Sequence, residues 1–99
     1  MPKTKTLTWD VAKHLTTEAD QVAYLEAALE VGDPSLITAA LGDIARAQGM
    51  TRVSSETGLG RESLYKALSA NGNPEFATVM KVLHALGLRL HVAPADLAS

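Results

Sequence analysis

The stretch Thr51–Leu68, with the sequence TRVSSETGLGRESLYKAL, constrains the fold more than any other part of the chain. Two short helical runs are separated by Gly58, which can adopt the positive φ that often ends a helix. The apolar positions predicted to face one small core are Val53, Leu59, Leu64 and Leu68. This arrangement is typical of a helix-turn-helix, whose second helix enters the DNA major groove. Because short patterns of this kind also occur by chance, the assignment of a helix-turn-helix depends on the sequence on either side.

Composition indicates one folded domain. The chain has 99 residues, 46% of them apolar, which suits a single modest core and excludes a disordered protein. It contains no cysteine, so disulfides and thiolate metal sites are excluded. No segment reads as a membrane span or a signal peptide, so we expect a cytoplasmic protein without a membrane partner.

Charge is distributed unevenly along the chain. Residues 14–45 contain six acidic residues and no lysine or arginine, whereas residues 46–99 contain six basic and four acidic residues. The net charge of −2 argues against a nucleic-acid binder, but the second half alone is basic. This asymmetry fits two surfaces that face two different partners. The alternative is that the acidic residues only solvate helix faces.

The acidic part, residues 9–48, is predicted to be helical and to follow an extended segment over residues 1–8. Asp10 is expected to cap a short helical turn that ends near Leu15. Two longer helices should follow, with Thr17 and Asp33-Pro34 at their starts and Gly32 and Gly49 at their ends. Gln21 and the glutamates are predicted to lie on the outer side of the first. The residues predicted to face the core are Val22, Leu25, Leu29, Ile37, Ala40, Leu41 and Ile44.

A loop rich in turn formers separates the Thr51–Leu68 stretch from the last predicted helix. Asn73-Pro74 is expected to open this helix and Gly87 to end it. The residues predicted to form its apolar face are Phe76, Val79, Met80, Leu83 and Leu86.

Residues 88–93 alternate apolar and polar side chains, which predicts one short strand. Since a single strand cannot form a sheet, it must pair with Thr4–Trp9 or with the same strand of a second chain. We favour the second arrangement, a homodimer, because helix-turn-helix proteins usually read two half-sites as dimers. The residues predicted to form the dimer contact are Leu88, Leu90 and Val92.

The sequence GMTRVSSETGLGRESLYKALS, followed by GNPEFATVMKVLHALGLRL, resembles the addiction module antidote proteins, which are HigA-like bacterial antitoxins. The blocks WDVAKHL and YLEAALEVGDPSLITAALGDIARAQGM also resemble that family, so the similarity covers roughly residues 9–92. It implies a single, mainly all-α domain of the Cro/C1 (lambda-repressor-like) type with five to six helices and one short C-terminal strand. The helix-turn-helix and the helix after it would then occupy residues 49–87.

The resemblance also implies a function, that of a DNA-binding antitoxin of a type II toxin–antitoxin module. Such a protein neutralises a small RelE/ParE-like toxin and represses its own operon by binding double-stranded operator DNA. Thr51–Thr57 corresponds to the positioning helix and Arg61–Leu68 to the recognition helix. Ser54 departs from the usual alanine of such proteins but is nearly as small. The alternatives are a stand-alone Cro/C1-type repressor and a helical protein-interaction module without DNA binding.

Candidate DNA contacts lie on and around the predicted recognition helix. Arg61 could donate two hydrogen bonds to guanine, or instead meet a phosphate or solvent. Glu62 could accept from cytosine or orient a neighbouring arginine. Tyr65 could reach the DNA through its hydroxyl or pack on the helix surface. The remaining candidates suit phosphates or base edges and are Arg52, Ser63, Lys66, Ser69 and Asn71.

No catalytic or metal-binding pattern is apparent in the sequence. His14, His84 and His91 do not share a metal-ligand spacing. There is no Ser/His/Asp arrangement, and no strand precedes Gly58-Leu59-Gly60 as a phosphate loop would require. We therefore expect no enzyme activity, no metal and no cofactor.

Overall fold

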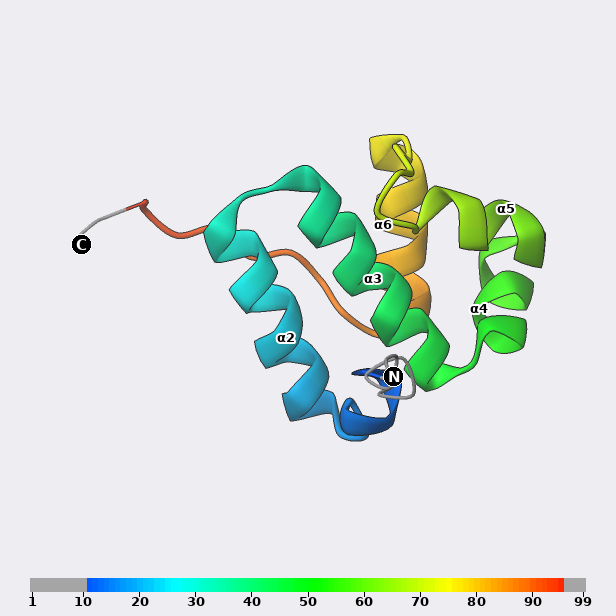
Figure 1. Cartoon of the computed structure of the whole chain (residues 1–99), viewed down its shortest axis with the longest axis horizontal. Helices are drawn as coiled ribbons and strands as arrows, with labels where there is room; N and C mark the ends of the chain where they lie inside the picture. The colour runs from blue at the N-terminus through cyan, green and yellow to red at the C-terminus, as the bar shows by residue number, and fades with distance from the viewer. Residues whose placement is uncertain (1–10, 96–99) are drawn as a thin grey trace, which may run out of the picture.

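The computed structural model describes residues 11–95 (Figure 1). In this range the chain forms one 3-10 helix, five α-helices and no strand. The elements are η1 (Val11–His14), α2 (Glu18–Val31), α3 (Pro34–Gln48), α4 (Met50–Thr57), α5 (Arg61–Ala67) and α6 (Phe76–Leu86). The predicted mainly helical class is confirmed, and no helix in the described range is long and apolar enough to cross a membrane. The predictions for residues 1–8 and for Asp10 lie outside the described residues.

The starts of the two long helices follow local side-chain chemistry. Thr17 accepts a hydrogen bond from the backbone N–H of Asp20 at 3.0 Å, and Asp33 accepts one from Ser35 at 3.0 Å. Each bond satisfies a backbone donor that has no partner within its helix. Gly32 ends α2 in the left-handed conformation with φ of 82°. The predicted caps of α2 and the predicted start of α3 are therefore confirmed.

The face that α2 buries differs from the predicted one. Leu25 is buried as expected, but Val22 and Leu29 remain 39% and 42% exposed. Gln21 is buried instead, although we predicted it to lie outside. Its amide donates to the carbonyl of Leu15 at 2.9 Å, which removes the penalty of burying an unpaired polar group. The predictions for Val22, Leu29 and Gln21 are therefore wrong.

A polar contact holds α2 against α3. The hydroxyl of Tyr24 donates to the carboxylate of Asp43 at 2.6 Å, and the guanidinium of Arg46 donates to the same carboxylate at 2.7 Å. Burial, together with the hydrogen bond to Asp43, raises the pKa of Tyr24 to about 12. Ionisation is disfavoured because it would place a phenolate beside a carboxylate in a partly buried position.

We expect Tyr24→Phe to lower the free energy of unfolding at neutral pH by about 1 kcal/mol, since the hydroxyl bond is lost. The pKa of Tyr24 is higher in the fold than its ordinary value of 10.0. The bond therefore stabilises the fold fully below that value, and its contribution disappears as pH rises through about 12. Urea unfolding of both proteins between pH 7 and pH 12 measures this. Equal stabilities at pH 7, or a difference that does not shrink at high pH, would contradict the assignment.

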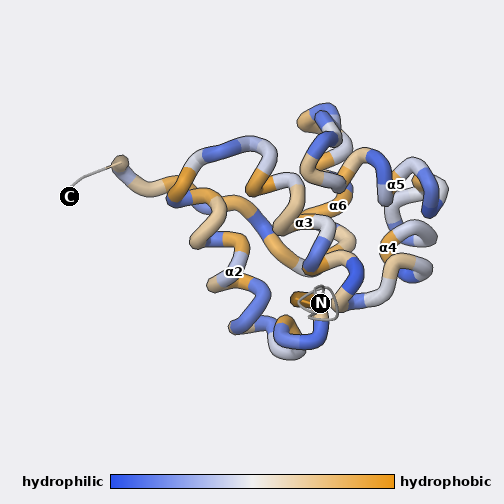
Figure 2. Tube along the Cα trace, viewed as in Figure 1, coloured by the Kyte–Doolittle hydropathy of each residue, from blue (hydrophilic) through white to orange (hydrophobic). Residues whose placement is uncertain are grey.

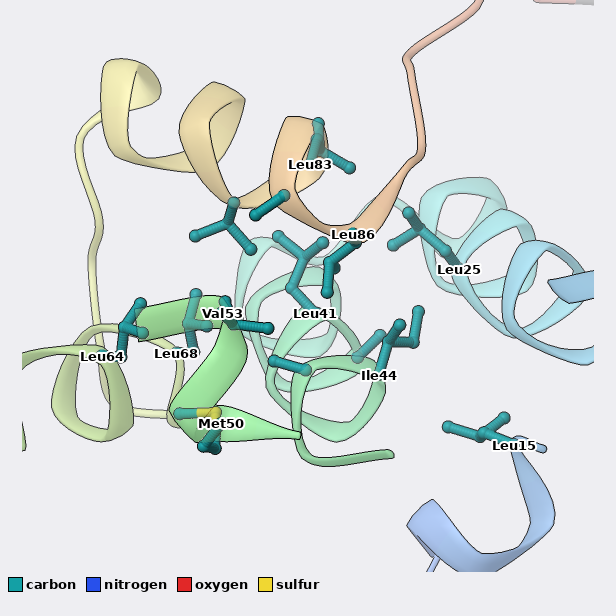
Figure 3. Packing of buried hydrophobic residues seen from close by; sticks show 14 of the residues in the cluster. Leu15, Leu25, Leu41, Ile44, Met50, Val53, Leu64, Leu68, Leu83 and Leu86 are labelled. Carbon is teal, nitrogen blue, oxygen red and sulfur yellow. The ribbon is translucent and has the colours of Figure 1, made fainter. Parts of the chain in front are cut away.

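Helix α3 lies in the middle of the molecule and packs against η1, α2, α4 and α6 (Figure 1). Its predicted stripe is confirmed, with Ile37 partly buried and Ala40, Leu41 and Ile44 buried. The buried side chains gather into one cluster around it (Figure 3). The cluster consists of Leu15, Leu25, Ala28, Ala40, Leu41, Ile44, Ala45, Met50, Val53, Leu64, Leu68, Val82, Leu83, Ala85 and Leu86.

Gly42 allows α3 to approach the end of α5. A Cβ atom at this position would lie 2.4 Å from the carbonyl oxygen of Leu68 and 3.3 Å from its Cβ atom. A carbon and a backbone oxygen cannot come so close without displacing one of the two segments. The missing side chain of Gly42 therefore sets where α5 ends against the core.

Helix α6 begins later than predicted. Its N-cap is Glu75, with no side-chain capping bond, so the prediction that Asn73-Pro74 opens the helix is wrong. Phe76 and Met80 are exposed rather than part of the apolar face. The residues that α6 buries are Val82, Leu83, Ala85 and Leu86. Gly87 ends the helix in the left-handed conformation, as predicted.

The predicted strand over residues 88–93 does not form within the described chain. Leu88 packs against the core, but Leu90 and Val92 are 41% and 90% exposed. No backbone hydrogen bond in the described range involves residues 89–95. The segment leaves α6 as an extended tail (Figure 1) and has no neighbouring strand to form a ladder with. Its proposed alternative partner within the chain, Thr4–Trp9, lies outside the described residues.

Candidate nucleic-acid interface

The turn between α4 and α5 is built from one glycine and two hydroxyl side chains. Gly58 ends α4 in the left-handed conformation with φ of 77°, as predicted. The hydroxyl of Ser54 donates to the carbonyl of Leu59, and that of Thr57 donates to the carbonyl of Val53 at 2.8 Å. The first bond joins the turn to α4 and the second lies within α4, so together they fix the path of the chain as it leaves α4. The hydrogen bond of Ser54 was not predicted, because only the small size of this residue was considered.

Helix α5 has one buried and one exposed side. Leu64 is fully buried, and Leu68, just beyond the helix, is buried as well. The opposite side carries the predicted DNA contacts, all of them exposed: Arg61, Glu62, Ser63, Tyr65 and Lys66. In Figure 1, α4 and α5 lie on one side of α3 and α2 lies on the other. The exposed side of α5 is therefore open to a large ligand.

Arg61 and Tyr65 contact each other across one helical turn. The guanidinium carbon of Arg61 lies 5.9 Å from the centre of the Tyr65 ring, in the range of a cation–π contact. Residues four positions apart share one side of a helix, so the contact follows from their spacing. The ring of Tyr65 thus contacts Arg61 on the helix surface and stays partly exposed, and a DNA contact through its hydroxyl remains a prediction. The contact restricts the conformations of Arg61 before any ligand binds.

An open hollow of about 420 Å³ lies between α5 and the loop that follows it. Its lining consists of Ser63, Lys66, Ala67, Ser69, Asn71, Gly72 and Asn73. Gly72 brings the loop close to the helix, since a Cβ atom there would lie 2.2 Å from the carbonyl oxygen of Ala67. Its N–H donates to the carbonyl of Ser69 at 2.9 Å. Predicted contacts from α5 and from the loop are thereby brought together around one hollow.

Arg52 differs from the other predicted contacts because its guanidinium is held within the chain. It donates to the carbonyl of Ala85 at 3.1 Å and to the side-chain oxygen of Gln48, and it pairs with Glu56 at 3.0 Å. These contacts tie the first turn of α4 to the end of α6. The role was missed because Arg52 and Ala85 are far apart in the sequence and only folding brings them together.

Gln48 of α3 and Gln21 of α2 continue this set of polar contacts from Arg52 to α2. The amide nitrogen of Gln48 donates to the carbonyl of Leu86 at 3.0 Å and to the side-chain oxygen of Gln21 at 2.8 Å. Gln21 in turn binds the carbonyl of Leu15. Within residues 11–95, every buried side-chain nitrogen or oxygen atom has a partner. The only sequence signal for this role is a pair of glutamines on helices that also carry core residues.

The exposed side of α5 and the following loop offer positive charge and hydrogen-bond donors. Arg61 and Lys66 are basic, Glu62 is acidic, and Ser63 and Ser69 carry hydroxyl groups. Such groups suit phosphate oxygens and the edges of bases. In the described range, no three His, Asp or Glu side chains come together in a way that could hold a metal ion.

Comparison with known proteins gives matches over nearly the whole chain. Residues 5–94 match the model of a family described as "Probable addiction module antidote protein". The chain is also 50% identical over 90 residues to an uncharacterized protein of Haemophilus influenzae, covering 91% of this chain and 93% of that protein. No solved structure matches the chain. The similarity therefore includes the acidic helices as well as α4 and α5.

Proposed function

Because the chain belongs to the family of probable addiction module antidote proteins, we propose that it is a DNA-binding antitoxin that neutralises a partner toxin and represses its own operon. An antidote implies a toxin as its partner, so family membership carries the first half of this proposal. The exposed polar side of α5 carries the second half. The protein then acts by binding, in the cytoplasm, and needs no catalytic group or cofactor.

In the DNA-binding half, α4 and α5 act as a Cro/C1-type helix-turn-helix. Helix α5 enters the major groove, where Arg61 reads a guanine. Lys66 and the hydroxyls of Ser63 and Ser69 contact phosphates, which fixes the register on the duplex. Arg52 can also reach a phosphate, because a guanidinium has five N–H donors and the internal contacts leave some of them unused.

In the antitoxin half, the partner is a small RelE/ParE-like toxin. Residues 14–45 carry six acidic residues and no lysine or arginine, which favours a basic protein as partner. A stand-alone repressor would leave this acidic half without a role.

The chain acts as a homodimer, joined through the extended tail after α6. Leu90 and Val92 are exposed on a segment whose backbone groups are unpaired in the described chain. Pairing with the same segment of a second copy would bury both side chains and satisfy those groups.

We expect Leu90→Asp to weaken dimerisation by at least about tenfold, since it places a charge where an apolar side chain becomes buried. Leu90 is 41% exposed in the single chain, so the fold should tolerate the change. Sedimentation of wild type and variant over a range of concentrations measures the effect, with Lys81→Ala on α6 as control. A variant with an unchanged dimer would show that the tail does not hold the copies together.

Co-expression with the product of the adjacent gene tests the antitoxin half. That product alone should arrest growth, and this protein should restore growth and co-purify with it. A harmless product that does not co-purify would leave a stand-alone repressor. A chain that binds the toxin but no DNA would be a protein-interaction module instead.

A further inference from the structure

The geometry points to one ridge of α2 as the surface that binds the toxin, an inference that rests on the proposed antitoxin function. Glu18, Val22, Glu26 and Leu29 follow one another at spacings of four, four and three residues. Such spacings place side chains on the same side of a helix. All four residues are exposed, and we call them the α2 ridge. Hydrophilic and hydrophobic residues alternate along this helix in Figure 2.

The fold gives no reason for the two aliphatic residues of the α2 ridge to be exposed. Val22 and Leu29 are 39% and 42% exposed, while the same helix buries the polar side chain of Gln21. An amphipathic helix normally turns its aliphatic residues inward and its amides outward. Here the buried amide joins the contact with Gln48, while two aliphatic side chains on either side of Glu26 stay partly exposed. This arrangement suits a helix that contacts the core on one side and a partner on the other.

The charges beside these aliphatic residues identify the kind of partner. Glu18 and Glu26 form no ion pair with any described residue, in contrast to Asp43 and Glu56, which do. No lysine or arginine occurs between residues 14 and 45 to neutralise them. A protein interface commonly combines an apolar centre with a polar or charged rim, and complementary charge speeds association. The α2 ridge therefore fits a basic protein that presents an apolar contact between its lysines or arginines.

The position of the α2 ridge is compatible with both proposed activities. α2 and α5 lie on opposite sides of α3 (Figure 1). A toxin on α2 would leave the exposed side of α5 free for DNA. The toxin therefore need not displace the DNA by occupying the same surface.

The test uses the full-length protein and the purified product of the adjacent gene, with affinity measured by calorimetry. We expect the double variant Val22→Ala/Leu29→Ala to bind this product at least about tenfold more weakly, because apolar contacts near the centre dominate affinity. Glu26→Lys, made as a single variant, should also weaken binding to this product, and that binding should depend less on salt. Alanine favours helix, so α2 should persist, which circular dichroism and thermal unfolding check.

Matched controls lie on α6 and at its N-cap. Met80→Ala removes an aliphatic side chain that is 41% exposed, and Glu75→Lys reverses an exposed charge. Both controls should bind the product as the wild type does. The double variant should bind the DNA upstream of its own gene with unchanged affinity.

The outcomes separate this inference from the function on which it rests. If the wild type binds the product and the double variant binds it equally well, the α2 ridge is not the toxin surface, and the antitoxin function stands. If the double variant changes the oligomeric state of the free protein, a second copy occupies the ridge and the inference is wrong. If the wild type does not bind the product at all, the proposed antitoxin function itself fails, and this inference with it.

Discussion

Gly42→Ala is expected to lower the free energy of unfolding by about 2 kcal/mol net, because overpacking this tightly packed site costs about 3 kcal/mol, the upper part of the usual range. The added methyl carbon would lie 2.4 Å from the backbone oxygen of Leu68. A backbone atom cannot rotate aside as the end of a long side chain can, so α3 or the end of α5 must move. Alanine favours helix over glycine by about 1 kcal/mol, which offsets only part of the cost.

Thermal and urea unfolding measure this effect. For a chain of this size, a net loss of about 2 kcal/mol corresponds to a fall in Tm of roughly 8 °C or more. Gly60→Ala is the matched control, because a Cβ atom there meets nothing within 4 Å and its φ is −67°. The control should change stability by less than about 1 kcal/mol. If both variants were equally stable, α3 and the end of α5 could not approach each other as described.

Arg61→Ala is expected to weaken binding to the DNA upstream of the gene by about 10- to 100-fold per half-site, as for the loss of one bidentate contact to guanine. Arg61 is exposed at the start of α5 and is oriented by the ring of Tyr65. The variant should also relax sequence preference at one base pair in each half-site. A mobility shift with a set of single-base substitutions measures both effects.

Two further variants separate base reading from charge. Arg61→Lys keeps the positive charge but loses the planar pair of donors, so it should retain general DNA affinity and lose specificity. Lys81→Ala removes one exposed positive charge from α6 that is not among the predicted DNA contacts, and it should bind almost as well as the wild type. An unchanged affinity and an unchanged base preference in Arg61→Ala would remove this residue from the reading role.

Features set by a few neighbouring residues could be predicted from the sequence. Thr17 and Asp33 cap their helices because a short oxygen-bearing side chain reaches the first backbone N–H groups. Gly32, Gly58 and Gly87 each end a helix with positive φ, a conformation that costs glycine little. The exposed side of α5 was predictable for a similar reason, since the burial of Leu64 leaves its polar neighbours outside.

Features that depend on distant parts of the chain could not be predicted. The apolar residues of α2 allow more than one inward face, and Gln21 is buried only because Leu15 and Gln48 supply its hydrogen-bond partners. The internal contacts of Arg52 depend in the same way on α6. Gly42 has no local signal beyond its place inside a helix, because its role depends on the later segment that approaches it.

The tail after α6 shows a different limit of prediction from the sequence. Alternating apolar and polar residues predict an extended backbone, and the segment is indeed extended, but alternation alone cannot supply a pairing partner. A strand over residues 88–93 therefore needs a partner, either Thr4–Trp9, which lies outside the described residues, or a second copy of the chain, which the dimerisation experiment tests.

The most direct test of the proposed function compares the affinity of the wild-type protein for two duplexes of equal length at physiological salt. One duplex is the DNA upstream of its own gene, and the other is a scrambled sequence of the same composition. The proposal predicts at least about 1,000-fold tighter binding to the upstream DNA, the lower limit for specific recognition. Equal affinity for the two duplexes would contradict it.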